Sequence, residues 1–271
     1  MSDDVCVQFL QWVLPQLHMR WPGFRKVHAQ VCKRIRRRLK QLTIDGFTDY
    51  RHYLETHNDE WKTLDALCRV TVSRFYRDKQ MFIFLEQTVL PNMARQAVAR
   101  GDECLKVWCV GSGSGEEPYT IAIIWKLILQ KQFPNLRLQV IASDAEPNMK
   151  QRAQAACYEY GSIKNLPETW REKVFTRQDA LFCLKLEYQY DVQFIVQDVR
   201  EVLPADEFDM VLCRNLVFTY FDEPLQRKML ERIMRALKPE GTLVIGIHEN
   251  LPENLEGLRV WSERLRIFQN E

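Results

Sequence analysis

The sequence predicts an α/β protein in which an all-helical region precedes a parallel, doubly wound sheet. Residues 1–100 show the apolar spacing of helices, as in "VCKRIRRRLKQL", without the alternation typical of strands. After Gly101, short β-branched runs alternate with amphipathic stretches, an order that favours a parallel sheet with helices on both faces. We therefore expect a helical domain at 1–90 and an α/β domain at 91–271.

The elements of the second domain follow from these runs. Strands are predicted at 105–110, 138–143, 192–197, 208–213 and 241–247. Helices are predicted at 116–131, 146–157 and 223–238. The last helix is expected to stop at "KPEG", because proline and glycine end a helix. The tail, 258–269, is predicted to form a two-stranded hairpin that closes one edge of the sheet.

Residues 158–191 interrupt the alternation of strands and helices. The segment is too long for a simple connection between two elements. It contains "LFCLKLEYQY", which we expect to pair with "VQFIVQ" as a small antiparallel insert.

Composition limits the class of protein. The chain is 46% hydrophobic, enough for a sizeable core, and its 27% of charged residues predicts a soluble surface. The formal net charge of +2 gives no broad nucleic-acid signature, so we expect no nucleic-acid partner. No apolar run approaches the roughly 18 residues of a membrane span, and the acidic start "MSDDVCVQFL" is unlike a signal peptide.

Eight cysteines are spread along the chain. None forms a Cys-x-x-Cys pair, and no His/Cys cluster has zinc spacing, so no metal site is predicted. Cys109 and Cys213 stand inside apolar runs, where a reduced thiol acts as a small hydrophobe. We therefore expect reduced cysteines and a cytoplasmic protein.

The strongest local signal is the glycine-rich stretch "WCVGSGSGEEPYTIAIIW". The predicted strand 105–110 runs directly into Gly111 and Gly113, which permit a tight turn and let backbone approach a ligand closely. Asp144 ends the next strand, where a carboxylate can accept hydrogen bonds from a ribose diol. This pattern indicates a cofactor that carries a nucleoside.

The acids after the glycines indicate which cofactor. Glu116 and Glu117 occupy the first turn of the predicted helix, where they would repel a pyrophosphate. S-adenosylmethionine has an ammonium, a sulfonium and a ribose but no phosphate, and it fits better. The stretch also lacks the P-loop pattern. The alternative is an acidic helix cap that follows a turn.

Polar residues also follow the third and fourth strands. Asp198 could accept an adenine amino hydrogen or be a solvated acid at a strand end. Arg214, Asn215 and Tyr220 are polar groups in an apolar context, so they predict a site, because buried polar groups need partners. The alternative for Arg214 is a structural ion pair with a nearby acid.

Taken together, four stretches resemble one family of methyltransferases. They are "FYRDKQMF", "GSGSGEEPYTIAIIW", "IASDAEPNMKQRAQAACY" and "DMVLCRNLVFTYFDEPLQRKMLERIMRALKPEGTLVIG", and the resemblance as a whole covers roughly residues 25–250. They resemble the CheR family, whose members use S-adenosylmethionine to esterify glutamates of bacterial chemoreceptors and release S-adenosylhomocysteine. The resemblance implies a helical N-terminal domain, a Rossmann-like class I methyltransferase sheet and a small inserted β-subdomain.

The resemblance also implies roles for individual residues. Together with the two glycines Gly111 and Gly113, the cofactor-binding residues would be Thr71, Ser73, Arg77, Glu116, Glu117, Asp144, Asp198, Val199, Arg214 and Asn215. Arg77 and Tyr220 would act near the reacting methyl group. The alternative for Arg77 is a surface salt bridge with Asp78 or Glu86.

This chain departs from the family pattern at four places. "VGSGSG" stands where many members have Ala-Gly-Cys-x-Thr/Ser-Gly, although the generic methyltransferase glycine pattern is kept. Thr71 replaces a common Asn, and "HENLP" at 248–252 replaces His-Ser-Glu-Asn-Phe. The segment 158–191 has no glycine beyond Gly161, so the glycine-rich loop that holds a receptor tail in some members is not evident.

The basic segment Lys33–Lys40 is the predicted docking helix. The segment has three interpretations: a solvated helix face, a dock for an acidic protein substrate and, third, a nucleic-acid patch. We expect a monomer that methylates protein glutamates. The alternatives are a different protein or small-molecule acceptor, and a signalling protein that binds S-adenosylmethionine without turnover.

Overall fold

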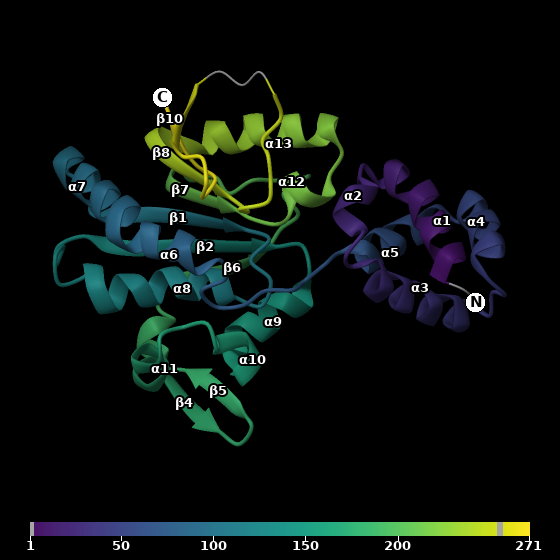
Figure 1. Ribbon diagram of the computed structural model, residues 1–271, viewed down its shortest axis with the longest axis horizontal. Coiled ribbons are helices and arrows are strands. Elements are labelled where there is room, and N and C mark those ends of the chain that lie inside the picture. The colour runs from purple at the N-terminus through teal and green to yellow at the C-terminus, as the bar shows by residue number, and fades with distance from the viewer. Residues whose placement is uncertain (1–2, 254–256) are drawn as a thin grey trace. The chain divides into compact units, whose positions relative to one another are not determined.

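The computed structural model describes residues 3–253 and 257–271, and the chain divides into two compact units (Figure 1). The helical unit comprises Met1–Thr71 together with Thr219–Gln226. The larger unit comprises Val72–Phe218 and Arg227–Glu271. The domain limits expected from the sequence, 1–90 and 91–271, stay a prediction.

Residues 3–71 of the helical unit form five α-helices and one 3₁₀ turn. These are α1 Asp3–Val13, η1 Leu14–Leu17, α2 Trp21–Phe24, α3 His28–Leu42, α4 Phe47–Thr56 and α5 Asn58–Cys68. The apolar spacing in α3 buries one face, with Ile35 and Leu39 at most 1% exposed. The later segment joins this unit where the Arg20 amide donates to the Tyr220 carbonyl at 2.8 Å. The helical character expected for this region is confirmed.

The larger unit contains a seven-stranded sheet in the order β6-β2-β1-β7-β8-β10-β9. Its strands are β1 Cys104–Val110, β2 Arg137–Asp144, β6 Val192–Val196, β7 Phe208–Cys213, β8 Leu237–Ile245, β9 Leu258–Ser262 and β10 Ile267–Asn270. The first five are parallel to one another, and β10 and β9 add the expected antiparallel edge beside β8. The strand order reverses between β1 and β7, a place where open α/β sheets bind ligands.

Helices cover both faces of this sheet (Figure 1). They are α6 Lys79–Phe84, η2 Leu85–Val89, α7 Leu90–Arg100, α8 Glu116–Ile124, η3 Trp125–Leu129, α9 Pro147–Ala155, α12 Val217–Tyr220 and α13 Glu223–Ala236. Alternate β1 residues Val107 and Cys109 belong to one core with residues of α7 and α8. Trp108 points to the other face and stacks on Phe208 at 5.6 Å. The α/β class is confirmed.

The insert is a separate three-stranded sheet in the order β3-β5-β4. Its elements are β3 Cys157–Glu159, α10 Tyr160–Ile163, α11 Glu168–Val174, β4 Phe175–Gln178, β5 Leu181–Leu184 and η4 Leu186–Tyr188. The expected pairing of this segment with 192–197 is wrong, because β6 lies parallel to β2 in the main sheet. The insert instead pairs β5 with β3 and, through a short turn at left-handed Asp179, with β4.

The "KPEG" stop also differs from expectation. Helix α13 ends earlier, at Ala236, and strand β8 begins at Leu237 and runs through these four residues. Glu240 is left-handed, with φ 60°, and the pairing of β8 with β7 shifts register nearby. The proline and glycine therefore mark an irregular strand start rather than a loop.

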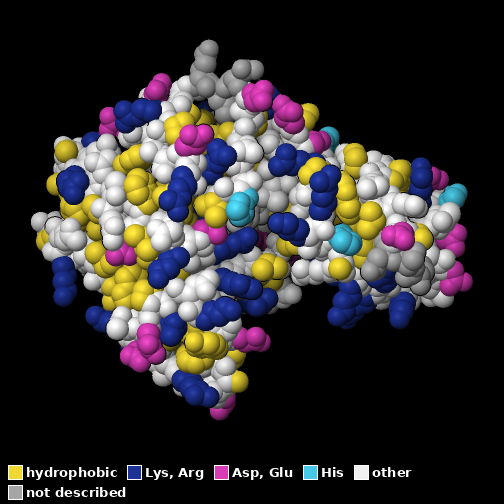
Figure 2. All heavy atoms as spheres, viewed as in Figure 1, with side chains coloured by type: hydrophobic (Ala, Val, Ile, Leu, Met, Phe, Trp, Pro, Cys, Tyr) yellow, Lys and Arg dark blue, Asp and Glu magenta, His cyan; other side chains and the backbone are white. Residues whose placement is uncertain are grey.

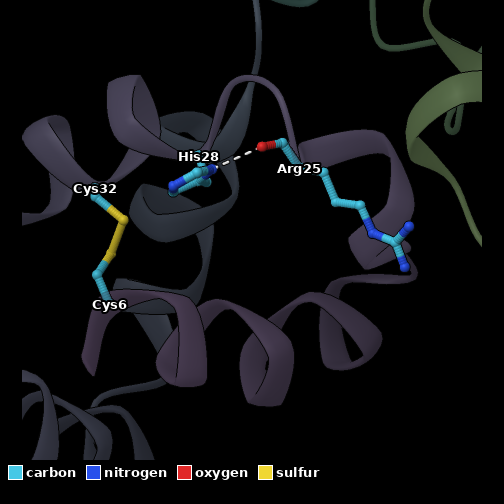
Figure 3. Close-up of a disulfide and its surroundings, with 4 residues drawn as sticks. All are labelled: Cys6, Arg25, His28 and Cys32. Atoms are coloured by element: carbon cyan, nitrogen blue, oxygen red, sulfur yellow. Dashed lines mark hydrogen bonds between the residues drawn. A yellow bond between two sulfur atoms is a disulfide. The ribbon is translucent and has the colours of Figure 1, made fainter. Parts of the chain in front are cut away.

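Four of the eight cysteines are paired, so the expectation of wholly reduced cysteines is wrong. Cys6 of α1 bonds to Cys32 of α3, beside the contact of the His28 ring with the Arg25 carbonyl (Figure 3). Cys157 bonds to Cys183, its direct cross-strand partner in the insert. Cys109 and Cys213 are buried thiols, as expected. Each pair is 26 residues apart, a separation that carries no pairing signal by itself.

Along the described chain, no helix combines the length and the apolar character that a membrane crossing needs.

Candidate functional site

The glycine loop lies where β1 and β2 end. The Ser112 amide donates to the Ser143 carbonyl at 3.0 Å, and the Gly113 amide donates to Asp144 Oδ2 at 2.9 Å. Gly111 is left-handed, with φ 67°, and a Cβ there would lie 2.6 Å from the Leu216 side chain. The loop is thus tied to β2 and admits no side chain at its first position.

Asp144 is held by backbone on both carboxylate oxygens. Oδ1 accepts from the Glu146 amide and Oδ2 from the Gly113 amide, each at 2.9 Å. A carboxylate oxygen accepts hydrogen bonds, so these two backbone donors orient the group. Its place at the end of β2 is the one predicted for a ribose contact.

The two adjacent glutamates contact different neighbours. Glu116 is 4% exposed and accepts from the hydroxyls of Ser114, at 3.1 and 3.2 Å, and Ser162, at 3.1 Å. Glu117 accepts from Arg214 Nη1 at 2.5 Å. The first acid therefore joins α8 to the insert, and the second joins α8 to the end of β7.

Arg214 is the centre of the buried charge in the site. Its side chain is 2% exposed, and Nη2 donates to Asp78 Oδ2 at 2.5 Å while Nη1 donates to Glu117. The guanidinium also lies over the Phe82 ring at 5.5 Å. One guanidinium thus faces two carboxylates, so this cluster, the Arg214 clamp, carries an excess of negative charge when both acids are ionised.

The protonation of Glu117 reflects this setting. Burial raises the pKa of Glu117, and the positive charges of Arg214 and Arg77 oppose that rise. A further cation placed beside the Arg214 clamp would favour the ionised carboxyl. The Arg214 clamp is therefore suited to a positively charged ligand group.

Arg77 stands in a turn with an unusual backbone. Tyr76 and Asp78, on either side, are both left-handed, with φ 54° and 62°. Such residues persist only where their surroundings hold them, and they gather at functional sites. The Tyr76 amide donates to Thr120 Oγ1 at 3.3 Å, and Arg77 Nη1 donates to the Val72 carbonyl at 3.2 Å. We name residues 75–78 the arginine turn.

The residues after β6 and β7 are also held locally. Both oxygens of Asp198 accept from Arg200, at 2.7 to 3.2 Å, and Val199 is 6% exposed. Asn215 is left-handed, with φ 56°, and its amide donates to Glu249 Oε2 at 2.9 Å. Glu249 also accepts from the Gly246 amide, at 2.6 Å, so it fixes the ends of β7 and β8 together.

Three buried polar atoms at these strand ends have no hydrogen-bond partner within the described residues. They are Ser112 Oγ, Gln197 Oε1 and Arg214 Nε, which follow β1, β6 and β7. Buried polar atoms in folded proteins are nearly always paired. An unpaired donor, acceptor and hydroxyl at neighbouring strand ends indicate a ligand with several polar groups.

The structure brings most of the predicted site together within the larger unit. Arg77, the two glycines, both glutamates, Asp144, Asp198, Val199, Arg214 and Asn215 belong to segments at the carboxyl ends of the strands or to the arginine turn, and Ser73 lies two residues before that turn. Thr71 and Tyr220 belong to the helical unit. Tyr220 packs edge-on against Phe24 at 5.1 Å. As cofactor and catalytic residues, all of these stay predictions.

Sequence reasoning missed several residues. Asp78 was considered only as an ion-pair partner of Arg77, yet it binds Arg214. Glu249 lies in "HENLP", where this chain departs from the family pattern, although an acid a few residues after a strand is a usable signal. Tyr158 and Ser162 carry no sequence signal, because only the packing of the insert brings them to the glycine loop.

Comparison with known proteins places these features in context. The family model described as CheR methyltransferase, SAM binding domain, matches residues 71–266. The chain is 30% identical to the chemotaxis protein methyltransferase of Escherichia coli over 231 residues, 81% of this chain and 76% of that protein. It is 28% identical to the chemotaxis protein methyltransferase of Borreliella burgdorferi over 221 residues, 80% and 78% of the two chains.

A further relative is much longer. An uncharacterised 104.1 kDa protein of Rhodobacter capsulatus is 28% identical over 239 residues, which make up 88% of this chain and 25% of that protein. The chain therefore spans about three quarters of the two methyltransferases and a quarter of this larger relative.

Proposed function

This chain belongs to the CheR methyltransferase family, and we propose that it transfers the methyl group of S-adenosylmethionine to glutamate carboxylates of a protein substrate of the chemoreceptor kind. The observation that carries the proposal is the Arg214 clamp, in which one buried guanidinium faces Glu117 and Asp78. Its excess negative charge suits a cofactor with an ammonium and a sulfonium.

The unpaired atoms of the site fit the same cofactor. The donor Arg214 Nε matches a carboxylate, the acceptor Gln197 Oε1 matches an amino group, and the Ser112 hydroxyl can serve as either donor or acceptor. S-adenosylmethionine carries a carboxylate, two amino groups and ribose hydroxyls. When bound, it supplies a methyl group attached to a positively charged sulfur. Asp144, at the end of β2, is the residue that would hold the ribose.

The acceptor side of the reaction calls for positioning more than for proton transfer. A glutamate has a pKa of about 4.3 and is already ionised near neutral pH, so no general base is needed. The acceptor oxygen forms a bond to the methyl carbon as the carbon–sulfur bond breaks, and the electron pair stays on sulfur. Holding the reactants in line can supply roughly 7–11 kcal/mol of the barrier.

Arg77 is the proposed group that holds the acceptor. A guanidinium can bind a carboxylate by two parallel hydrogen bonds. Arg77 is half-buried and stands in the arginine turn, whose backbone is fixed on both sides. Its charge also lies near enough to Glu117 to favour the ionised acid. Tyr220 is proposed to donate one more hydrogen bond to the acceptor.

Helix α3 is the proposed dock for the acidic substrate. Lys33, Arg37 and Lys40 are exposed on it, while Ile35 and Leu39 are buried on its other face. Figure 2 shows Lys and Arg side chains projecting from the edge of the helical unit where α3 lies. A row of cations steers acidic partners and suits a glutamate-rich helix. We also propose that the protein acts as a cytoplasmic monomer.

The proposal is tested with labelled cofactor and receptor-bearing membranes. Methyl label that is released as methanol by mild alkali indicates a carboxyl ester, whereas alkali-stable label indicates another acceptor. We expect alkali-labile label with the wild type and at least a hundredfold less with Arg77→Ala, because positioning is lost. Stable label, or undiminished transfer by Arg77→Ala, would rule the proposed reaction out.

A second candidate acceptor is a carboxylate of another protein or of a small molecule. The insert favours it, because its only glycine is Gly161 and its β4–β5 turn is short. A receptor-tail dock of the glycine-rich kind is therefore not evident. Alkali-labile label on a lysate component other than a chemoreceptor would support this candidate.

A further inference from the structure

We propose that the inserted subdomain, residues 157–188, is a positioning element for methyl transfer. It holds the glycine loop through Tyr158 and the arginine turn through Trp170. This inference rests on the proposed function, since it takes Arg77 as the residue that holds the acceptor.

The first contact reaches the glycine loop. Tyr158, in the middle of β3, is 4% exposed, and its hydroxyl donates to the Ser114 carbonyl at 2.8 Å. Ser162 of α10 donates to Glu116 at 3.1 Å, one residue before the acid of the Arg214 clamp. The loop conformation therefore depends on two hydroxyl donors that the insert supplies.

The second contact reaches the arginine turn at Phe75. The Phe75 amide donates to the Ser162 carbonyl at 3.0 Å. Its ring packs edge-on against Tyr158 at 4.8 Å and against Phe175 of β4 at 5.4 Å. Phe75 is fully buried, so the start of the turn is enclosed by the insert.

The third contact fixes Tyr76, the residue directly before Arg77. Trp170 of α11 packs edge-on against the Tyr76 ring, with centroids 5.8 Å apart and planes at 82°. The Tyr76 ring also stacks on Phe82 at 5.3 Å, and its hydroxyl donates to Glu86 at 3.0 Å. These contacts hold Tyr76 in its left-handed backbone conformation, which is unfavourable for a residue with a side chain unless its surroundings fix it.

A loosened arginine turn would misplace the Arg77 guanidinium. A displacement of about 1 Å at a positioning group can cost about a hundredfold in rate. Trp170 and Tyr158 touch neither the acceptor nor the reacting atoms in this scheme, so they are positioning residues. Their effect must pass through Arg77 and through the glycine loop.

The chain offers a matched control for Trp170. Trp261 of β9 is also half-buried and packs edge-on against a ring, Phe84, at 6.5 Å and 83°. Trp170→Leu and Trp261→Leu therefore remove similar contacts from the same unit. Hydrogen exchange of the full chain, followed by mass spectrometry, should quicken in residues 72–78 for Trp170→Leu only. Equal protection of 72–78 in both variants overturns the proposal.

A double-mutant cycle tests whether Trp170 acts through Arg77. We expect Trp170→Leu to lower kcat about tenfold with an unchanged KM for S-adenosylmethionine, and to have no effect when Arg77 is already Ala. Trp170→Phe keeps an aromatic ring at this position and should retain most of the wild-type kcat. If Trp170→Leu folds poorly, the comparison of Trp170→Phe with the wild type tests the same role. If Trp170→Leu lowers kcat by the same factor with Arg77 and with Arg77→Ala, Trp170 has only a structural role.

Tyr158→Phe tests the glycine loop without any acceptor. Calorimetry should show binding of S-adenosylmethionine weakened about fivefold, because the Ser114 carbonyl loses its donor. Unchanged affinity overturns this half of the proposal. If the exchange and calorimetry results hold but no carboxylate is methylated, only the proposed function fails. If methylation proceeds while every variant matches its control, only the positioning role fails.

Discussion

Two ion-pair clusters, one in each unit, differ in how completely they are satisfied: buried Glu60 binds the partly exposed Arg38, and buried Arg214 binds two acids. In the helical unit, Arg38 binds both oxygens of Glu60, at 2.7 and 2.9 Å, and the Tyr50 hydroxyl donates to the same acid at 2.7 Å. One positive charge meets one negative charge, with an extra donor. This cluster has no need of a ligand.

The Arg214 clamp in the larger unit is left incomplete. Arg214 meets two acids, Glu117 and Asp78, and its Nε has no partner within the described residues. Burial of Glu60 is outweighed by the donors Arg38 and Tyr50, which lower its pKa, whereas burial prevails at Glu117 and raises its pKa. Similar residues therefore form a fully paired cluster in one unit and, in the other, an incompletely paired cluster that we propose binds a cationic ligand.

The largest expected effect comes from breaking the Arg214 clamp. Arg214→Met leaves two acids without their cation and should weaken binding of S-adenosylmethionine at least about a hundredfold, with a loss of stability of about 3 kcal/mol. Calorimetry and urea denaturation measure the two effects. Affinity within twofold of the wild type would show that the Arg214 clamp plays no part in binding.

Breaking the Arg38–Glu60 ion pair in the helical unit should lower the stability of the fold without changing cofactor affinity. Glu60→Gln removes the partner of Arg38, a partly exposed residue, so we expect a loss of about 2 kcal/mol in urea denaturation. Affinity for S-adenosylmethionine should be unchanged, since Glu60 lies outside the larger unit. Weakened cofactor binding in this variant would contradict the contrast between the two clusters.

The opposite pKa shifts predict opposite responses to pH. Because the pKa of Glu117 is raised, this acid loses its charge at a higher pH than a free glutamate, and cofactor affinity should fall by up to about tenfold per pH unit below that pKa. Glu117→Gln should flatten this dependence. Affinity that stays constant down to about pH 4.3 in the wild type would contradict it.

The pKa of Glu60 is lowered, whereas that of Glu117 is raised. Its lowered pKa contributes stability above the usual value of about 4.3, and this contribution is lost as pH falls through the folded-state pKa. Thermal denaturation of the wild type and of Glu60→Gln should therefore converge in acid.

The smallest effect is expected for Tyr50→Phe. It removes one donor from Glu60 but leaves the ion pair with Arg38 in place. We expect a loss of about 1 kcal/mol in denaturation and no change in cofactor affinity. A loss as large as that of Glu60→Gln would mean that the hydroxyl, not the ion pair, holds the cluster.

The local sequence pattern was sufficient to predict those features that depend on residues close together in the sequence. The five parallel strands, the terminal hairpin and the helical start were predictable from periodicity, as was the loop at Gly111 and Gly113. Glu117 and Arg214 were predicted as site residues from their place after strands, but nothing in their spacing of 97 residues indicated that they pair. Asp78 and Glu249 were not predicted as site residues for the same reason: their partners are distant in the sequence.

The sequence by itself determined the class of fold, the glycine loop that follows the first strand and, through its motifs, the methyltransferase family. The tertiary structure alone decided which cysteines pair, how the insert folds on itself, and that Tyr158 and Trp170 contact the segments around Arg77. The physical reason is that periodicity and turn chemistry act over a few residues. Disulfides, ion pairs and ring contacts form between side chains that only the completed packing brings within reach.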